Sequence, residues 1–162
     1  QHTWLRRQRQ MCIRDRFPVS AILANNDVMM CIKPGEHGST FGGNPLACVV
    51  AKAALEVIVD EKLAENAMEL GNYFRSEINK FIKTSSLVNL VRGKGLLNAI
   101  VINDSETSET AWNLCVEMKN NGLLAKPTHG NIIRFAPPLT INKDQLDVCI
   151  KIITDTVKNY KP

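Results

Sequence analysis

The sequence has no long hydrophobic run and no regularly paired cysteines. No apolar stretch approaches the roughly 20 residues that a membrane-spanning helix needs, so we expect no membrane association. The five cysteines are irregularly spaced, which is typical of reduced thiols and argues against a disulfide framework or a zinc site. We therefore expect no bound metal.

An excess of one charge is also missing from most of the chain. Residues 1–16 hold five of the 20 basic residues and one of the 16 acidic residues, so residues 17–162 carry 15 of each. A neutral body without clustered lysines and arginines lacks what binding to a nucleic-acid backbone requires, and we predict no nucleic-acid partner. At 162 residues and 44% hydrophobic, the chain can bury a core and has an ordinary α/β composition.

The segment from Gly35 to Pro45 is rich in glycine and contains two adjacent hydroxyl residues, Ser39 and Thr40. Glycines allow tight backbone turns and expose N–H groups, and the hydroxyls add two more donors at the same place. Such a loop suits an oxyanion, in particular a phosphate. The alternative is a plain turn, because most glycine-rich loops bind nothing.

The remaining pattern predicts helices alternating with short strands. Apolar residues recur at helical spacing in four stretches: 46–58, 63–81, 111–118 and 146–157. Asn44 with Pro45, and Asn142 with Gln145, are typical helix starts. Strands are expected at 19–24 (buried), 87–91, 96–102, 123–125 and 132–135. The last two are expected to flank a turn at 127–131, which begins with Pro127. The strands at 87–91 and 96–102 could pair antiparallel or form one bent strand. From about residue 60 onward, we expect a small antiparallel or mixed sheet covered on one face by helices.

Arginine is scarce after residue 16 and occurs only at positions 75, 92 and 134. Arg75 lies in a helix pattern and is expected on a solvated face. Arg134 lies in an alternating strand pattern that points it to the same side as Ile132, where a guanidinium needs a carboxylate or carbonyls to hold. The pattern leaves two interpretations open, a substrate-binding arginine and a structural ion pair.

Two histidines and a lysine lie beside glycines, which favours structural roles. His37 and His129 are expected to hydrogen-bond the backbone of their turns rather than to act in acid–base chemistry. Lys94, between two glycines, is expected to be a turn residue.

Three stretches resemble one enzyme family. They are IKPGEHGSTFGGNPL at 32–46, VRGKGLLNAI at 91–100 and GLLAKPTHGNIIRFAPPL at 122–139. Their amino-acid sequences and relative positions resemble those of the class III aminotransferases, which are pyridoxal phosphate (PLP) enzymes of fold type I. The resemblance covers roughly residues 17–162 and is greatest for the branch of the family that acts on ornithine.

The resemblance implies a C-terminal part of such a transferase, mainly its small α+β domain. Residues 17–58 would be the tail of the large PLP-binding domain with a connecting helix, and residues 59–162 the small domain. Ser39 and Thr40 would bind the phosphate of PLP, with Thr40 reaching the site of a partner subunit in a dimer or higher homo-oligomer. Arg134 would bind the α-carboxylate of an amino-acid or 2-oxo-acid substrate.

The resemblance also implies that the cofactor-binding lysine of the family is missing from this chain. The lysine that forms the Schiff base with PLP precedes Phe17 in the family, and residues 1–16 contain no lysine. Lys33 is a poor substitute because no pattern places it in a pocket. We therefore expect no catalytic residue in this chain and no activity of the chain alone.

Residues 1–16 are rich in arginine, as in a transit peptide, but they run directly into a segment that belongs inside the family's large domain. We interpret them as a foreign, disordered leader.

The parent reaction implied is transfer of the δ-amino group of ornithine to 2-oxoglutarate, giving glutamate 5-semialdehyde and glutamate. The alternatives are another class III enzyme, such as one for acetylornithine, and a non-catalytic docking module. With part of the fold missing, the apolar faces of 19–24 and 44–58 are expected to promote self-association. The mitochondrial matrix and the cytoplasm are both compatible with the family.

Overall fold

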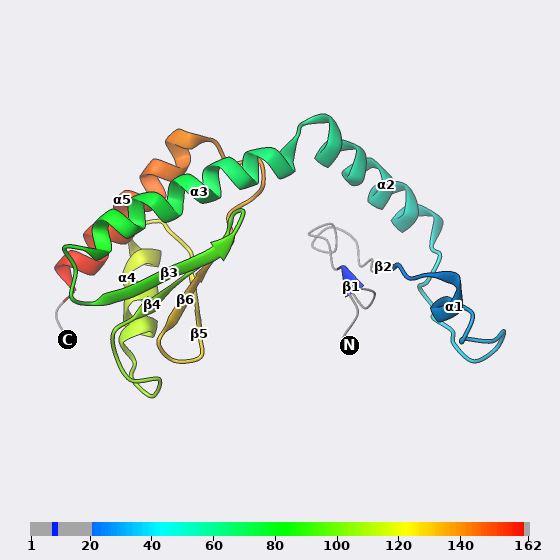
Figure 1. The fold of residues 1–162 in the computed structure, drawn as a ribbon, viewed down its shortest axis with the longest axis horizontal. Coiled ribbons are helices and arrows are strands. Elements are labelled where there is room, and N and C mark those ends of the chain that lie inside the picture. Colours follow the sequence, from blue (N-terminus) through cyan, green and yellow to red (C-terminus); the bar gives the residue numbers. More distant parts are fainter. Residues whose placement is uncertain (1–7, 10–20, 161–162) are drawn as a thin grey trace. The chain divides into compact units, whose positions relative to one another are not determined.

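The computed structural model describes residues 8–9 and 21–160, which form two compact units (Figure 1). One unit ends at Glu61 and the other begins at Lys62, and each is described by itself. The expected domain limits, 17–58 and 59–162, remain a prediction. The expected leader lies mostly outside the described residues, but Gln8–Arg9 forms a short strand, β1, where disorder was expected.

The first unit is built mainly from one long helix and the loop before it. Strand β1 pairs antiparallel with β2 (Ala21–Ile22), and a short helix α1 (Asn26–Met29) precedes the glycine-rich loop. Helix α2 (Pro45–Asp60) then begins as the sequence predicts. The side chain of Asn44 accepts a hydrogen bond from the Ala47 N–H at 3.1 Å, which satisfies one of the free donors of the first turn.

The apolar surface of this unit is largely exposed. Within α2 only Ala47 is buried, and Val49 exposes 66% of its surface. The prediction of a buried strand at 19–24 is wrong for Ile22 and Leu23, which are 61% and 76% exposed. The physical reason is that β2 pairs only with β1 among the described residues, so no larger sheet covers it.

The second unit is a four-stranded antiparallel sheet with three helices. Its elements in chain order are α3 (Leu63–Ile82), β3 (Val88–Lys94), β4 (Leu97–Ile102), α4 (Thr110–Asn120), β5 (Lys126–Thr128), β6 (Ile132–Phe135) and α5 (Lys143–Asn159). The strand order is β3-β4-β6-β5. The small helix-covered sheet that the sequence predicts is confirmed, and its first two strands pair antiparallel rather than forming one bent strand.

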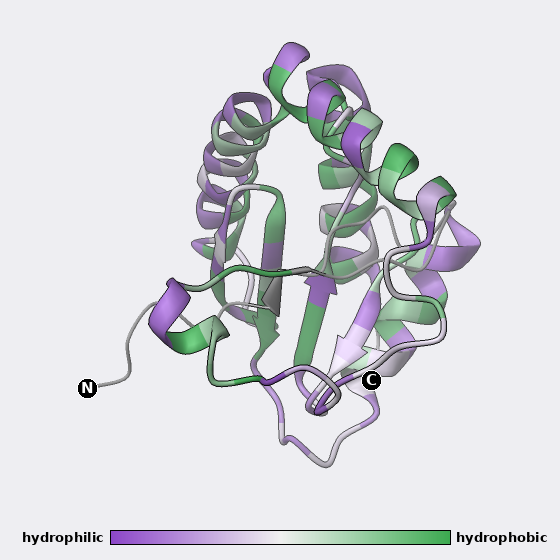
Figure 2. Ribbon diagram, turned by 90° about the vertical axis from the view of Figure 1, so that its right-hand side faces the viewer, coloured by the Kyte–Doolittle hydropathy of each residue, from purple (hydrophilic) through white to green (hydrophobic). Residues whose placement is uncertain are grey.

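The core of this unit lies between the sheet and the helices. The helical stripe predicted for 63–81 is buried along its whole length, and alternate residues of β4 and β6, including Ile100 and Ile133, are fully buried. Figure 2 shows the corresponding alternation of hydrophobic and hydrophilic segments along the helices. The other face of the sheet carries no helix of this unit, as Figures 1 and 2 show. That open face presents Arg134.

The predicted position of the first strand of the last hairpin is wrong by three residues. Residues 123–125 were expected to form a strand and Pro127 a turn, whereas Pro127 lies inside β5 and the turn comprises residues 129–131. Strand β5 is at the edge of the sheet, where a proline is tolerated because its missing N–H faces away from the ladder. His129 and Gly130 make the turn with φ angles of 51° and 69°.

The α3 helix lies unusually close to the β3–β4 turn. A Cβ added at Gly71 would lie 1.9 Å from the Gly95 carbonyl oxygen, so only glycine fits there. Arg75, one turn further along α3, donates to the Gly95 carbonyl at 3.0 Å and to Asn98 Oδ1 at 2.6 Å. The solvated position expected for Arg75 is therefore wrong, because its guanidinium supplies the donors that this turn and the buried Asn98 need.

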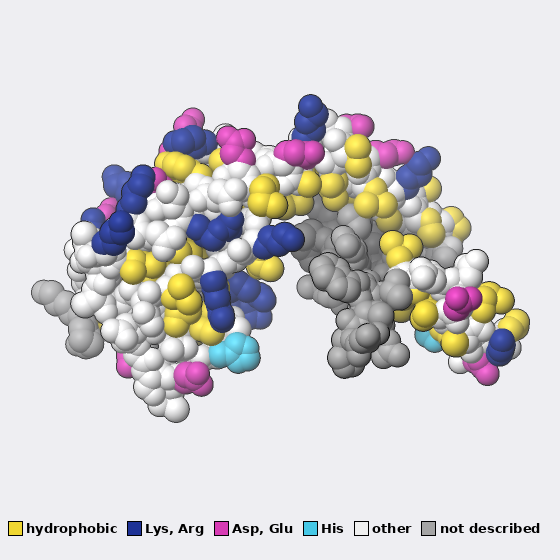
Figure 3. All heavy atoms as spheres, in the orientation of Figure 1, with side chains coloured by type: hydrophobic (Ala, Val, Ile, Leu, Met, Phe, Trp, Pro, Cys, Tyr) yellow, Lys and Arg dark blue, Asp and Glu magenta, His cyan; other side chains and the backbone are white. Residues whose placement is uncertain are grey.

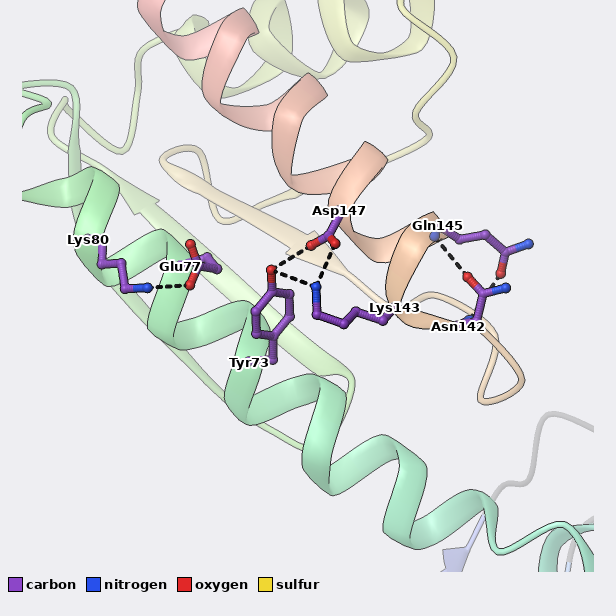
Figure 4. A network of polar contacts seen from close by, with 7 residues as sticks. All are labelled: Tyr73, Glu77, Lys80, Asn142, Lys143, Gln145 and Asp147. Atoms are coloured by element: carbon purple, nitrogen blue, oxygen red, sulfur yellow. Dashed lines mark hydrogen bonds and ion pairs between the residues drawn. The ribbon is translucent and has the colours of Figure 1, made fainter.

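A polar cluster joins α3 to α5 (Figure 4). The Tyr73 hydroxyl donates to Asp147 Oδ1 at 2.6 Å, and Lys143 Nζ donates to Asp147 Oδ2 at 2.8 Å. Hydrogen bonds from Lys143 and Tyr73 lower the pKa of Asp147. Beside it, Asn142 and Gln145 form the reciprocal capping box that the sequence predicts for the start of α5. These contacts hold α5 against α3, two of the helices that pack on the sheet.

Candidate functional site

The glycine-rich loop is shaped by glycine conformations and one side-chain hydrogen bond. Gly35 and Gly43 adopt φ angles of 88° and 71°, which strain other residues. The Gly42 N–H donates to Ser39 Oγ at 2.9 Å, and a Cβ at Gly42 would lie 2.9 Å from that of Ser39. The hydroxyl of Ser39 is thus oriented by the bond it accepts, and its own proton remains available.

Several donors of this loop have no acceptor in the part of the chain that the structure describes. They are the backbone N–H groups of Gly38, Ser39 and Thr40 and the Thr40 hydroxyl. All three residues are exposed, and the loop leads directly into the N-terminus of α2, whose partial positive charge favours an anion. This donor set fits a phosphate group, such as that of PLP.

Arg134 lies on the open face of the sheet in the second unit. Its neighbours in β6, Ile133 and Phe135, are buried on the helix side, which confirms the alternation that the sequence predicts. Ala99 of β4 and Lys126 of β5 lie directly opposite Arg134 in the register. The structural ion pair that the sequence left open is not formed, since no acidic side chain pairs with Arg134 among the described residues. Its guanidinium is therefore free to bind a carboxylate.

The two parts of the predicted site belong to different units. Ser39 and Thr40 lie in the unit that ends at Glu61, whereas Arg134 lies in the unit that begins at Lys62. The structure gives each part its own geometry.

Two histidines and two lysines were not expected to be catalytic, and the structure shows where each of them lies. Neither His37 nor His129 makes a side-chain hydrogen bond within residues 21–160, so the backbone contacts expected for them are wrong. Both are exposed, His129 in a turn and His37 in the irregular part of the glycine-rich loop. Lys94 ends strand β3 instead of lying in the turn, which shifts to Gly95. Lys33 donates to the Met30 carbonyl at 3.0 Å, a local contact that gives it no catalytic neighbour.

Sequence reasoning missed one feature of the open face. Arg92 and Lys126 lie in the same cross-strand row as Arg134, although the three are far apart in the sequence. In Figure 3 several Lys and Arg side chains lie close together in the region where Figure 1 draws the strands, while others lie along the helices. Only the strand register reveals this row, because the positions of charged residues along the chain do not show which strands pair.

The described residues contain no group of His, Cys, Asp or Glu side chains that could hold a metal ion. The described cysteines, Cys31, Cys48, Cys115 and Cys149, are free thiols, and burial raises the pKa of Cys115 to about 11. No helix among residues 8–9 and 21–160 is long and apolar enough to cross a membrane.

Comparison with known families decides what kind of protein this is. The model of the class III aminotransferases matches residues 12–157, most of the chain. The chain belongs to this family. The free loop donors and the unpaired Arg134 are thus features of a class III aminotransferase.

Individual relatives agree with the family assignment. Curated relatives named "Ornithine aminotransferase, mitochondrial" include one from Drosophila melanogaster, 60% identical over 141 residues, and one from Rattus norvegicus, 54% identical over 144 residues. The alignments cover 87% and 89% of this chain but 32% of each relative. The chain therefore spans about a third of the length of the curated relatives it matches.

Solved structures share the fold. An acetylornithine aminotransferase from Elizabethkingia anophelis matches with a TM-score of 0.84 and 66% identity, covering 88% of this chain and 37% of that protein. The ornithine δ-aminotransferase of Plasmodium falciparum matches with a TM-score of 0.80 and 50% identity, covering 86% of this chain and 36% of that protein. The α/β fold of this class III chain is thus that of one part of an aminotransferase.

Proposed function

We propose that residues 17–162 supply the phosphate-binding loop and the substrate-carboxylate arm of an ornithine aminotransferase. The observation that carries the proposal is Arg134, an exposed arginine without an acidic partner among the described residues, on a chain of the class III family. The whole protein would transfer the δ-amino group of ornithine to 2-oxoglutarate, giving glutamate 5-semialdehyde and glutamate. It would work as a homodimer or higher oligomer, in the mitochondrial matrix or the cytoplasm.

The loop would hold the phosphate of PLP. PLP, when bound, supplies the electron sink that allows an amino group to pass between an amino acid and a 2-oxo acid. The unused N–H groups at 38–40 and the Thr40 hydroxyl would donate to phosphate oxygens, while the Gly42–Ser39 bond keeps the loop in shape. By likeness to the family, Thr40 would serve the cofactor of a partner subunit.

Arg134 would orient the substrate. A guanidinium donates two parallel hydrogen bonds to a carboxylate, so it fixes the direction of the bound acid as well as its charge. Both an amino acid and a 2-oxo acid carry the α-carboxylate that this arrangement fits. Strand β6 provides a rigid support because its alternate residues are buried in the core.

The 162-residue polypeptide alone would be inactive. The cofactor-anchoring lysine of the family is expected before Phe17, where residues 1–16 contain none. Without that amine, the polypeptide lacks the group that attaches the cofactor covalently. PLP that stays attached to the purified polypeptide through dialysis would contradict this part of the proposal.

Acetylornithine is the second candidate substrate. It is favoured by the 66% identity to the solved acetylornithine aminotransferase, whereas the names of the curated relatives favour ornithine. The two amines differ in an acetyl group, so a direct comparison of kcat/KM separates them.

A chimera tests the proposal. Residues 17–162 replace the matching segment of the Drosophila melanogaster relative, and kcat/KM is measured for ornithine and for N-acetylornithine with 2-oxoglutarate. We expect ornithine to be preferred and Arg134→Leu to lower kcat/KM by about 10- to 100-fold, the loss of a charge-assisted hydrogen bond of roughly 1.5–3 kcal/mol. Lys119→Met, an exposed change on α4, serves as the control. A chimera unaffected by Arg134→Leu would refute the role of Arg134.

A further inference from the structure

A groove lies between helices α4 and α5 of the second unit. Its volume is about 790 Å³, which is within the range of small-molecule sites in proteins. Most of the residues that line it are exposed, so the groove is open to solvent. It is separate from Arg134, because α4 and α5 pack on the covered face of the sheet and Arg134 lies on the open face.

Three charged side chains line the groove, and none of them has an ion-pair partner among the described residues. Glu117 comes from α4, whereas Lys151 and Asp155 come from α5. On the same helix Lys143 pairs with Asp147 at 2.8 Å, although these two residues have the same spacing as Lys151 and Asp155. The groove therefore presents two anionic groups and one cationic group that are free to meet a ligand.

The uncharged part of the lining suits a short aliphatic chain with polar ends. Val116 of α4 and Val148 of α5 line the groove and are 37% and 58% exposed. Their methyl groups would contact the methylene groups of a ligand. Asn159 also lines the groove, and its side-chain amide makes no hydrogen bond within residues 21–160, so it can both donate to a ligand and accept from one.

Thr156 lines the same groove and has an unused hydroxyl. Its side chain is nearly buried, at 7% exposure, and its Oγ1 has no hydrogen-bond partner in the described part of the chain. Most buried hydroxyls of native proteins have a partner, and an unpaired one calls for an explanation. A ligand carboxylate oxygen at the floor of the groove would accept the Thr156 proton.

The charges of the lining determine which class of ligand is complementary. Two anionic groups and one cationic group match a molecule that carries two cations and one anion. A free amino acid with a side-chain amine has this set at neutral pH: an α-ammonium, a side-chain ammonium and a carboxylate. An amino acid without the second amine leaves one acidic residue unpaired, and a diamine leaves Lys151 unpaired.

We propose that the groove between α4 and α5 binds a free diamino acid, such as ornithine or lysine. Glu117 and Asp155 bind the two ammonium groups, and Lys151 binds the carboxylate. The valines contact the methylene groups between them. This site is additional to the proposed site at Arg134 and does not depend on it.

NMR titration of the 162-residue chain carrying Arg134→Leu tests the proposal, since this change removes the proposed carboxylate-binding residue on the open face of the sheet. The probes are ornithine, norvaline, which lacks the side-chain amine, and putrescine, which lacks the carboxylate. We expect ornithine to shift the amides of α4 and α5 and to bind about two- to fivefold more tightly than either other probe, the effect of one exposed ion pair.

Variants of the lining assign the charges. Glu117→Gln and Asp155→Asn should each reduce the preference for ornithine over norvaline, and Lys151→Met should reduce the preference for ornithine over putrescine. Glu69→Gln, which neutralises an exposed carboxylate on α3 outside the groove, should change neither preference.

The contrary outcomes are equally defined. If norvaline or putrescine binds as tightly as ornithine, or if both preferences survive all three substitutions in the lining, the diamino-acid site is refuted. The proposed function stands in either case, because it rests on Arg134. Amide spectra of each variant verify the fold, and no loss of fold is expected because Glu117, Lys151 and Asp155 are exposed.

Discussion

The two units of the chain differ in how they use their apolar residues. The unit that begins at Lys62 buries its own core of aliphatic and aromatic side chains between a sheet and three helices. The unit that ends at Glu61 exposes most of the apolar side chains of α2, and Ile22 of β2 is exposed too. The first kind of segment stabilises itself, whereas the second needs a further surface to cover it. Arg134, the proposed carboxylate-binding residue, therefore lies on self-supporting structure, and the proposed phosphate-binding loop does not.

The largest difference in stability is expected when one apolar side chain is removed from each unit. Ile153→Ala removes a side chain that is 1% exposed and should lower the free energy of unfolding of the second unit by about 2–5 kcal/mol. Val49→Ala removes one that is 66% exposed and should change stability by no more than about 0.5 kcal/mol. Urea denaturation measures both. A large loss in Val49→Ala would show that α2 has a buried face after all.

Helices were predictable because their signals are local. The capping residues Asn44 and Asn142, and the apolar stripe that begins at Leu63, all lie within a few residues of the structure that they specify. Strand β5 was misplaced because Pro127 signals a turn locally but is tolerated at a sheet edge, and the edge is a property of the whole sheet.

The candidate site follows the same division. The loop donors could be read from a contiguous segment, and the alternation of β6 pointed Arg134 outward. The row that contains Arg92, Arg134 and Lys126 could not be derived from the sequence. It forms only through the pairing of β3 with β4, of β4 with β6 and of β6 with β5. The contact of Arg75 with Gly95 is equally non-local, since it depends on the close approach of α3.

Helix capping offers an intermediate test of the same contrast. Asn142→Ala removes one half of the capping box of α5 and should destabilise the second unit by about 1 kcal/mol. Asn44→Ala removes the equivalent hydrogen bond from α2, in the first unit, and should leave the stability of the second unit unchanged. Native-state hydrogen exchange, followed at amides 62–160, distinguishes the two. Equal effects there would mean that the units unfold together.

The smallest expected effect concerns pH and is confined to the second unit. Hydrogen bonds from Lys143 and Tyr73 lower the pKa of Asp147 in the folded state, so the stability that this group contributes is present above the unfolded pKa of about 3.9. It is lost as the pH falls through the lower folded pKa. We therefore expect Asp147→Asn to be less stable than the unchanged chain at pH 7, and the difference to shrink as the pH is lowered below about 4.

The control for this test lies on the same helix. Asp144→Asn changes an exposed carboxylate at the start of α5 that has no ion pair among the described residues. Urea midpoints measured across the acid range should show a pH-dependent difference for Asp147→Asn that exceeds that of Asp144→Asn. If the Asp147→Asn difference instead persists at full size in acid, the cluster stabilises α3 against α5 through packing of the Tyr73 ring and the Lys143 side chain rather than through the charge of Asp147.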